Sequence, residues 1–325
     1  MEHIIKTENK QYALDIKSIT KTDKQIECVS VADLEFSGQL VDLVCGNNKA
    51  IYAGTFKEES CIIKRGRSDT LDLALNEAYW LRQCKHKNVI DLYSITIWHN
   101  TVTNSYESQL VTKAYTDLFD VLYGHNNIER ELETRMHLPF IFKDVLEGLC
   151  YLHSMNIYHR DIKAENVVID MSCSPYQAKL IDLEQTSMFP WDKNNKFGTL
   201  HYSAPEVLAK GPITHPSRID IWCFGLMLWY AYSSSTDPVI IQGNNARQLL
   251  ISIRKTTGLL PKKYYKSAEL YEDVQYAAHR YPIVNYVELS DNKPLNQILS
   301  VTLQADPVRR CEGYVISMMD FFCDL

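Results

Sequence analysis

The chain has 325 residues, of which 46% are hydrophobic and 23% are charged, and its formal net charge is −6. The length predicts two lobes, because single hydrophobic cores stop growing near ~250–300 residues. The acidic balance argues against a nucleic-acid-binding protein. Nine scattered cysteines without a CxxC pair favour reduced thiols in the cytoplasm or nucleus over a disulfide framework.

The sequence gives no reason to expect targeting to a membrane. Its first residues, MEHIIKTENK, lack the apolar run of a signal peptide. The most apolar segment, Ile221–Tyr232, is shorter than the ~20 residues that a bilayer-spanning helix needs. We therefore expect a buried helix at this segment and no membrane association.

The first third of the chain is typical of a small β-rich lobe. Residues 1–35 are mixed and polar, and we expect an extra strand or a loose arm there. From Phe36 the runs LVDLVCG, AIYAGTF and SCIIKRG each end at Gly, Asn or a charge, as strands of antiparallel hairpins do. Apolar residues then recur at helical spacing over Leu71–Cys84. Two further strands are predicted at Val89–Ile97 and Gln109–Thr112.

The remainder of the chain has a helical character. We predict helices over Leu138–Ser154 and Ile219–Ser233, and mostly helical structure after Ala246. A hinge is expected near Thr112–Thr116. The predicted fold class is therefore α+β, with a small β-rich lobe that has one main helix (36–115) and a larger, mostly helical lobe (116–325).

One short stretch, IYHRDIKAENVVID at Ile157–Asp170, is crowded with polar groups between two apolar runs. Unpaired charges are expensive to bury, so the stretch is either a solvated loop or a catalytic loop mounted on a strand. Its polar side chains are those of His159, Arg160, Asp161, Lys163, Glu165 and Asn166.

Four motifs, in this order, resemble the eukaryotic protein kinase family: HRDIKAEN, LIDLE, GTLHYSAPEVL and DIWCFG. The resemblance extends from about Leu40 to Arg310. It implies a bilobal fold, ATP as the phosphoryl donor, Mg²⁺ (or Mn²⁺) as the metal, and protein substrates. Neither nucleic acid nor membrane is an expected partner, and the sequence does not indicate an oligomeric state.

The resemblance also implies the catalytic groups of the larger lobe. Asp161 matches the catalytic Asp that orients the substrate hydroxyl, and Lys163 the cation beside the transferred phosphate. Asn166 and Asp182 match the two metal ligands, whose oxygen atoms suit Mg²⁺. Lys163, together with Thr199, is typical of kinases that act on Ser or Thr.

In the small lobe the resemblance implies a nucleotide site. Lys64 of CIIK matches the lysine that contacts the α- and β-phosphates, and Glu77 on the following helix its ion-pair partner.

The glycine-rich loop over the nucleotide is degraded. Gly46 aligns with its middle glycine and Ile51 with its Val, while Val44 and Lys49 replace the other glycines. A plain hairpin turn that does not grip phosphate remains an alternative. The hinge residues Thr112 and Ala114 complete the expected nucleotide site.

Glu184 departs from the family pattern, because DLE replaces the usual DFG. Glycine at this position supports unusual backbone angles, and a Glu with φ > 0 costs on the order of 1 kcal/mol. We therefore expect a restricted switch that holds Asp182 inward more often.

Four other residues are expected to support the site. Glu206 and Arg310 match the buried ion pair that fastens the activation segment, and His159 is expected to organise the catalytic loop. Asp220 either anchors the backbone of that loop or caps the helix that follows it, and both roles are compatible.

Two alternative functions stay open: a pseudokinase that acts as a nucleotide-binding or scaffold protein, and a small-molecule kinase of related fold. Glu206 and Arg310 argue against the latter. The segment LLISIRKTTGLLPKKYY resembles a linker of the cyclin-dependent and MAP kinase group, yet Ser203 stands where that group usually has Arg, so no subfamily is assigned. Glu165 and the negative net charge slightly favour substrates with basic segments.

Overall fold

The computed structural model describes residues 41–45, 49–100, 104–124, 128–188, 198–233, 241–279 and 292–323. They divide into two compact units, the first comprising the residues up to Lys85 with Val89–Ala114 and the second comprising His86–Asn88 with the residues from Tyr115 onward. Residues 1–35, predicted as an arm or extra strand, lie outside the described residues.

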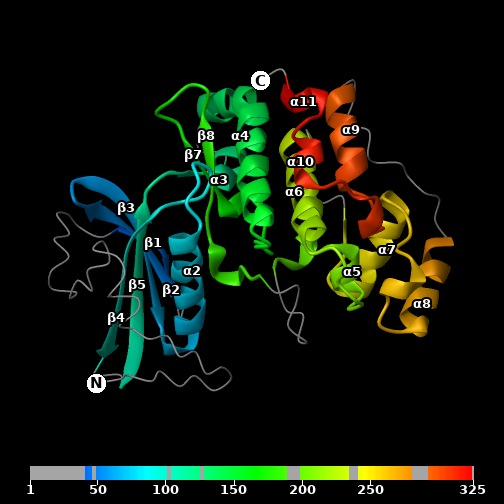
Figure 1. Ribbon diagram of the computed structural model, residues 1–325, viewed down its shortest axis with the longest axis horizontal. Coiled ribbons are helices and arrows are strands. Elements are labelled where there is room, and N and C mark those ends of the chain that lie inside the picture. The colour runs from blue at the N-terminus through cyan, green and yellow to red at the C-terminus, as the bar shows by residue number, and fades with distance from the viewer. Residues whose placement is uncertain are drawn as a thin grey trace. The chain divides into compact units, whose positions relative to one another are not determined.

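The first unit is built on a five-stranded antiparallel sheet with the order β1-β2-β3-β5-β4 (Figure 1). Cys61, Ile63 and Val111 form one buried hydrophobic cluster of this unit, against which three aromatic side chains pack. Its main helix, α2, spans Leu71–Gln83. The strands are β1 Val41–Cys45, β2 Lys49–Phe56, β3 Glu59–Arg67, β4 Leu92–Asn100 and β5 Ser105–Lys113.

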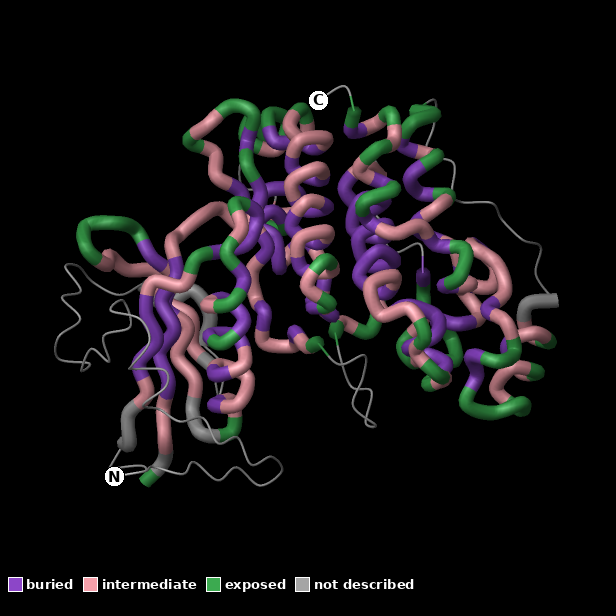
Figure 2. Tube along the Cα trace, in the orientation of Figure 1, coloured by how far each residue is buried: buried purple, intermediate pink, exposed green. Residues whose placement is uncertain are grey.

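The second unit is mostly helical around α4 (Ile128–Ser154) and α6 (Ser217–Tyr232). Every residue of α6 from Ile219 to Ala231 is buried, and Figure 2 shows this helix as a largely buried rod. The rings of Phe142 and Phe224, 5.8 Å apart, join α4 to α6. The predicted buried helix is confirmed. No helix among the described residues is long and apolar enough to cross a bilayer.

The other elements of this unit are short. They are β6 Thr116–Asp117, β7 Val167–Asp170 and β8 Gln177–Leu180, which form a three-stranded sheet, and the helices α3 Leu118–Tyr123, α5 Pro205–Leu208, α7 Ala246–Thr256, α8 Ala268–His279, α9 Lys293–Thr302, α10 Gly313–Ile316 and α11 Asp320–Cys323. The predicted α+β class, with a β-rich lobe and a helical lobe, is confirmed.

Three predicted boundaries were wrong, and one of them is the start of β5, which begins at Ser105 instead of the predicted Gln109. Helix α4 begins ten residues before the predicted Leu138, and Pro139 lies inside it. Proline is typical of a first helical turn, which favours a later start. The early turns also leave Ile128, Leu132 and Met136 exposed, which hides the usual apolar pattern. Strand β4 runs over Leu92–Asn100 instead of the predicted Val89–Ile97, because Val89 and Ile90 are buried before the strand begins.

Candidate active site

The polar loop after α4 is held in place by Asp220, a fully buried carboxylate on α6. Its two oxygens accept the backbone N–H groups of His159, at 2.9 Å, and Arg160, at 2.8 Å. Burial alone raises the pKa of a carboxyl. The pKa of Asp220 nevertheless lies below its usual value, because His153 donates a hydrogen bond to it, the electrostatic effects of His153 and His159 favour the carboxylate, and the Arg160 N–H donates to it.

The expected anchoring role of Asp220 is confirmed by these contacts, whereas its predicted role as a helix cap is wrong. Helix α6 begins at Ser217 after Pro216, so Asp220 lies inside the first turn. His159 is fully buried, and its Nε2 lies 3.0 Å from the Ile181 carbonyl oxygen, which supports its expected role in organising the loop. His153, whose Nε2 is 2.9 Å from Asp220, was not found from the sequence, because helical spacing alone does not distinguish it from a surface residue.

Asp161 is held by three neighbours within the second unit. Its Oδ1 accepts the backbone N–H of Thr199, at 2.8 Å, and the Thr199 hydroxyl, at 3.0 Å. The Nζ of Lys163 lies 3.1 Å from Oδ2 and also donates to the Thr199 hydroxyl, at 2.8 Å. The carboxylate of Asp161, the ammonium of Lys163 and the hydroxyl of Thr199 therefore form a closed ring.

This ring depends on a close approach of Gly198. It has φ +69°, and a Cβ added there would lie 2.6 Å from the Arg160 carbonyl oxygen, so the backbone before Thr199 passes the catalytic loop at a distance that only glycine allows.

Asn166 completes the arrangement around Asp161. Its amide nitrogen donates to the Asp161 carbonyl oxygen, at 2.7 Å, and to the Asp161 carboxylate, at 3.1 Å. Both bonds use the NH₂ group, so the carboxamide oxygen is the atom left for a metal. A carboxamide oxygen and the carboxylate of Asp182 are hard donors of the kind that Mg²⁺ prefers. The residues present therefore fit a divalent metal.

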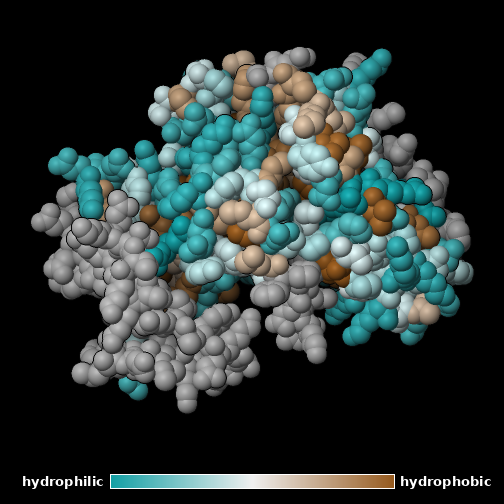
Figure 3. Space-filling view, viewed as in Figure 1, coloured by the Kyte–Doolittle hydropathy of each residue, from teal (hydrophilic) through white to brown (hydrophobic). Residues whose placement is uncertain are grey.

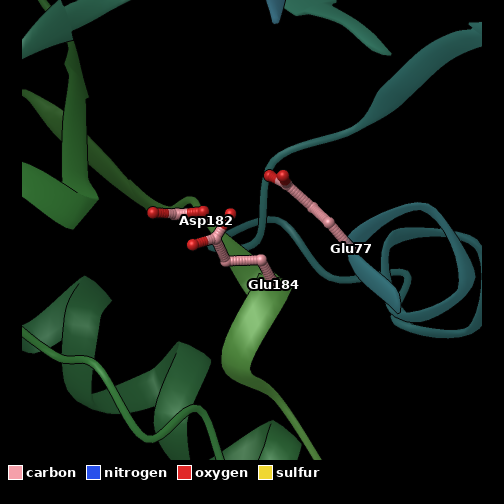
Figure 4. A group of neighbouring side chains, drawn as sticks. All are labelled: Glu77, Asp182 and Glu184. Atoms are coloured by element: carbon pink, nitrogen blue, oxygen red, sulfur yellow. The ribbon is translucent and has the colours of Figure 1, made fainter. Parts of the chain in front are cut away.

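The DLE segment has a different backbone from the one expected. Asp182 adopts φ 63° and ψ 62°, in the left-handed region, and Glu184 lies in a short 3₁₀ helix, Leu183–Gln185. Figure 4 shows Asp182 and Glu184 on this one turn. The expectation of strain at Glu184 was wrong, because the left-handed residue is Asp182, which tolerates that region better than bulkier side chains do. The backbone at Glu184 therefore gives no support to the predicted switch that would hold Asp182 inward.

In the first unit, Lys64 and Glu77 form the predicted ion pair. The Nζ of Lys64, on β3, lies 2.8 Å from Glu77 Oε1 on α2, and the Glu77 side chain is almost fully buried. Figure 4 shows Glu77 projecting from its helix. A buried carboxylate needs a partner, so Lys64 both satisfies Glu77 and is positioned by it.

Strand register aligns further predicted residues with Lys64. Ile51 pairs with Lys64 on one side and with Val44 on the other, so the three occupy one row across β1, β2 and β3. Directly paired residues point to the same face of a sheet, so the side chains of Ile51 and Lys64 share a face. Gly46 lies outside the described residues. Whether the turn at Gly46 binds phosphate or is a plain hairpin is therefore untested.

The expected hinge residues are both placed at the end of β5. Thr112 is buried and pairs with Ile62 of β3. Ala114 donates its backbone N–H to the Ser60 carbonyl oxygen, at 2.9 Å. That N–H is therefore occupied within the first unit, and a nucleotide base could use only the other backbone groups of this segment.

The predicted structural ion pair between Glu206 and Arg310 is present. Arg310 Nη1 donates to Glu206 Oε1 at 2.8 Å, and both residues are about 1% exposed. Arg310 also bonds to the carbonyl oxygens of Gln304 and Arg218. These contacts tie α5 to the loop before α10 and compensate the burial of both charges.

The family model of the protein kinase domain matches residues 47–322 of this chain. The chain belongs to the protein kinase family. Membership accounts for the β-sheet N-lobe and the helical C-lobe described above.

Three curated relatives illustrate the similarity. Mitogen-activated protein kinase kinase kinase 13 of Pongo abelii is 27% identical over 256 residues, which cover 76% of this kinase chain and 24% of that protein. A calcium/calmodulin-dependent serine/threonine-protein kinase of Malus domestica is 31% identical over 170 residues, which cover 51% of this chain and 38% of that protein. Calcium-dependent protein kinase 4 of Plasmodium falciparum is 31% identical over 181 residues, which cover 54% of this chain and 31% of that protein. This kinase chain thus matches less than two fifths of the length of each.

Proposed function

We propose that this chain is an active serine/threonine protein kinase that transfers the γ-phosphoryl group of ATP to Ser or Thr hydroxyls of protein substrates. The closed ring of Asp161, Lys163 and Thr199 supports the proposal, because it holds a carboxylate beside a cation, the pair of charges that phosphoryl transfer to a hydroxyl needs.

The roles of the residues follow from the chemistry of phosphoryl transfer. Asp161 orients the substrate hydroxyl and takes its proton as the oxygen bonds to the γ-phosphorus and the bond to the ADP oxygen breaks. Lys163 neutralises charge on the transferred group. Asn166 and Asp182 hold Mg²⁺ (or Mn²⁺), which supplies charge neutralisation on the phosphates when bound.

The first unit supplies the nucleotide-binding groups in this proposal. Lys64, held by Glu77, binds the α- and β-phosphates. Ile51 shares the face of Lys64 and packs against the base together with Thr112, and Val44 belongs to the same row of paired residues. Gly46 allows the closest approach of backbone to phosphate, and Ala114 contributes a backbone carbonyl.

Serine and threonine are the favoured acceptors for two reasons. The relative from Malus domestica is described as a serine/threonine-protein kinase. Lys163 also fills the space beside Asp161 with a cation that bonds to Thr199, which is the arrangement typical of that class.

Substrates with basic segments are slightly favoured. Glu165 is next to Asn166, and its Oε2 is buried without a hydrogen-bond partner in the described part of the chain. Its charge and that of Asp120 act on Asp117, whose pKa burial raises to about 6. A cationic side chain of a substrate would relieve this concentration of negative charge.

A transfer assay tests the proposal. The chain, incubated with ATP, Mg²⁺ and a generic basic protein, should phosphorylate Ser and Thr, and Asp161→Asn should lower the rate by at least about 10³-fold while leaving the melting temperature unchanged. Phosphotyrosine as the main product would contradict the acceptor assignment.

The pseudokinase alternative is favoured by one observation, the engagement of the Ala114 N–H with Ser60. A pseudokinase should show no transfer above the Asp161→Asn background, whether or not ATP with Mg²⁺ raises its melting temperature. Transfer that disappears in Asp161→Asn excludes it.

A further inference from the structure

A strongly basic segment lies outside the catalytic machinery. Residues 249–266, which include the linker-like sequence that fixed no subfamily, contain Arg254, Lys255, Lys262, Lys263 and Lys266 and no acidic residue. The chain as a whole has a net charge of −6, so this local excess of positive charge runs against the overall balance. Arg254 and Lys255 stand in the last turn of α7, where cations offset the helix dipole. The three lysines that follow have no such explanation.

Two buried tyrosines hold the segment Lys262–Lys266, which carries these three lysines and is called the strap below. Lys262–Tyr264 form a 3₁₀ turn in which Tyr264 is 1% exposed, and Tyr265 is 8% exposed. The backbone N–H of Lys266 donates to the Ala209 carbonyl oxygen at 3.0 Å. A Cβ added at Gly211 would lie 1.6 Å from the Tyr264 carbonyl oxygen, so the loop after α5 is in direct contact with the strap.

This contact brings a fourth lysine to the same place. Lys210 lies between Ala209 and Gly211 and is exposed, as are Lys262, Lys263 and Lys266. We call these four residues the basic patch. Over α7 and α8, Figure 3 shows mostly hydrophilic residues with scattered hydrophobic ones, and Figure 2 shows exposed residues in α8.

Two ammonium groups of the patch contact aromatic rings. The Nζ of Lys263 lies 4.9 Å from the ring centre of Tyr264, and the Nζ of Lys262 lies 5.6 Å from that of Tyr271. Within the described ranges, none of the four lysines forms an ion pair with a carboxylate. Cation–π contacts limit side-chain motion without removing charge, which lowers the entropic cost of binding an anion.

We propose that the basic patch docks an acidic segment of a protein substrate or protein partner. Three cations on one short segment, with Lys210 on the neighbouring loop, match a run of Asp and Glu residues. A protein segment is favoured over nucleic acid or an anionic membrane, because a surface of net charge −6 is repelled by extended polyanions more strongly than by a short peptide.

The position of the patch gives docking a consequence for catalysis, and this part rests on the proposed kinase activity. The patch adjoins α5, and Glu206 of α5 closes the segment that contains Thr199. Patch and catalytic loop belong to the same compact unit. A substrate held at the patch therefore presents its hydroxyl at a raised effective concentration.

Binding is tested with a fluorescent peptide of alternating Glu and Ser, using the full chain without ATP at about 0.15 M ionic strength. The triple variant Lys262→Gln, Lys263→Gln and Lys266→Gln should bind about tenfold more weakly than the wild type. A matched variant removes three exposed cations elsewhere, Lys57→Gln, Lys293→Gln and Arg309→Gln, and should change affinity by less than about twofold.

Equal weakening in both variants would overturn the proposal in favour of a general charge effect, as would the absence of salt-sensitive binding in the wild type. A single-stranded oligonucleotide and vesicles containing phosphatidylserine are compared with the peptide. Tighter binding of either through the same three lysines would overturn the choice of a protein partner.

A kinetic arm separates docking from catalysis. An acidic tail added to a peptide substrate should lower KM about tenfold in the wild type, leave kcat unchanged, and have no effect in the patch variant. Asp161→Asn should retain the peptide affinity of the wild type. Absence of transfer by the wild type together with intact peptide binding would contradict the proposed function and leave the docking surface standing.

Discussion

Thr199 contacts Asp161 twice, through its backbone N–H at 2.8 Å and its hydroxyl at 3.0 Å. The same hydroxyl accepts a bond from Lys163 at 2.8 Å. The segment after DLE thus reaches the Asp161 carboxylate directly, and its placement is coupled to the geometry of the loop that carries Asp161 and Lys163.

Replacing Thr199 by Val keeps the shape of the side chain and the backbone bond but removes the hydroxyl. We expect kcat to fall by about 10–100-fold, because Asp161 and Lys163 lose the group that holds them together. Steady-state kinetics on a Ser peptide measures this, and the KM for ATP should change little. Thr199→Ser retains the hydroxyl and should recover most of the activity; equal loss in both variants would contradict the argument.

Glu77→Gln removes the negative charge that positions Lys64 at 2.8 Å. We expect kcat/KM for ATP to fall by about 10–100-fold with little change in melting temperature, since the amide still accepts a hydrogen bond. Asp91→Asn serves as the control, because Asp91 and Lys85 form an exposed pair at 3.5 Å that contributes at most ~1 kcal/mol. An equal effect of the two substitutions would show that the Glu77 pair has no special role.

Asp220→Asn should destabilise the second unit by about 2–4 kcal/mol, because the single oxygen of the amide can accept only one of the two backbone N–H groups and its NH₂ then faces the other. Urea unfolding at neutral pH measures the loss. The pKa of Asp220 is lowered by folding, so its contribution is present above pH ~4 and disappears as pH falls through the folded pKa. A difference between variant and wild type that is independent of pH would argue against an ionised Asp220.

Asp117→Asn should stabilise the protein at high pH. Asp117 caps α3 by accepting the N–H of Phe119 at 2.7 Å and of Asp120 at 3.2 Å, and Asn caps equally well. Because burial raises the pKa of Asp117 to about 6, the folded state holds a proton that the unfolded state has lost above pH ~4. The free energy of unfolding of the wild type therefore decreases as pH rises from about 4 to about 6.

Thermal unfolding of Asp117→Asn and wild type should agree near pH 4 and differ by about 1 kcal/mol at pH 8, with the variant more stable. Asp91→Asn, at an exposed carboxylate, provides the control and should follow the wild type throughout. A variant that is less stable than the wild type at pH 8 would contradict the raised pKa.

Particular elements show how far the sequence could predict the fold. Helix α2 and strands β2 and β3 were found to within one or two residues, because each combines strong periodicity with a clear stop signal. The start of α4 was not, since Pro139 is a local start signal that tertiary packing overrides. The backbone at Asp182 and Glu184 was also misplaced, because a motif gives the order of residues and not their φ angles.

The sequence by itself determined the residue types and their order: a lysine on a strand, a glutamate on the next helix, and the HRDIKAEN, DLE and APE motifs. Local patterns suffice for this, since they follow from chemistry at short range. Only the tertiary structure decided which groups meet, as with Thr199 and Asp161, His153 and Asp220, or Lys266 and Ala209. Such contacts join residues far apart in the chain, and packing of the whole core, not local propensity, fixes them.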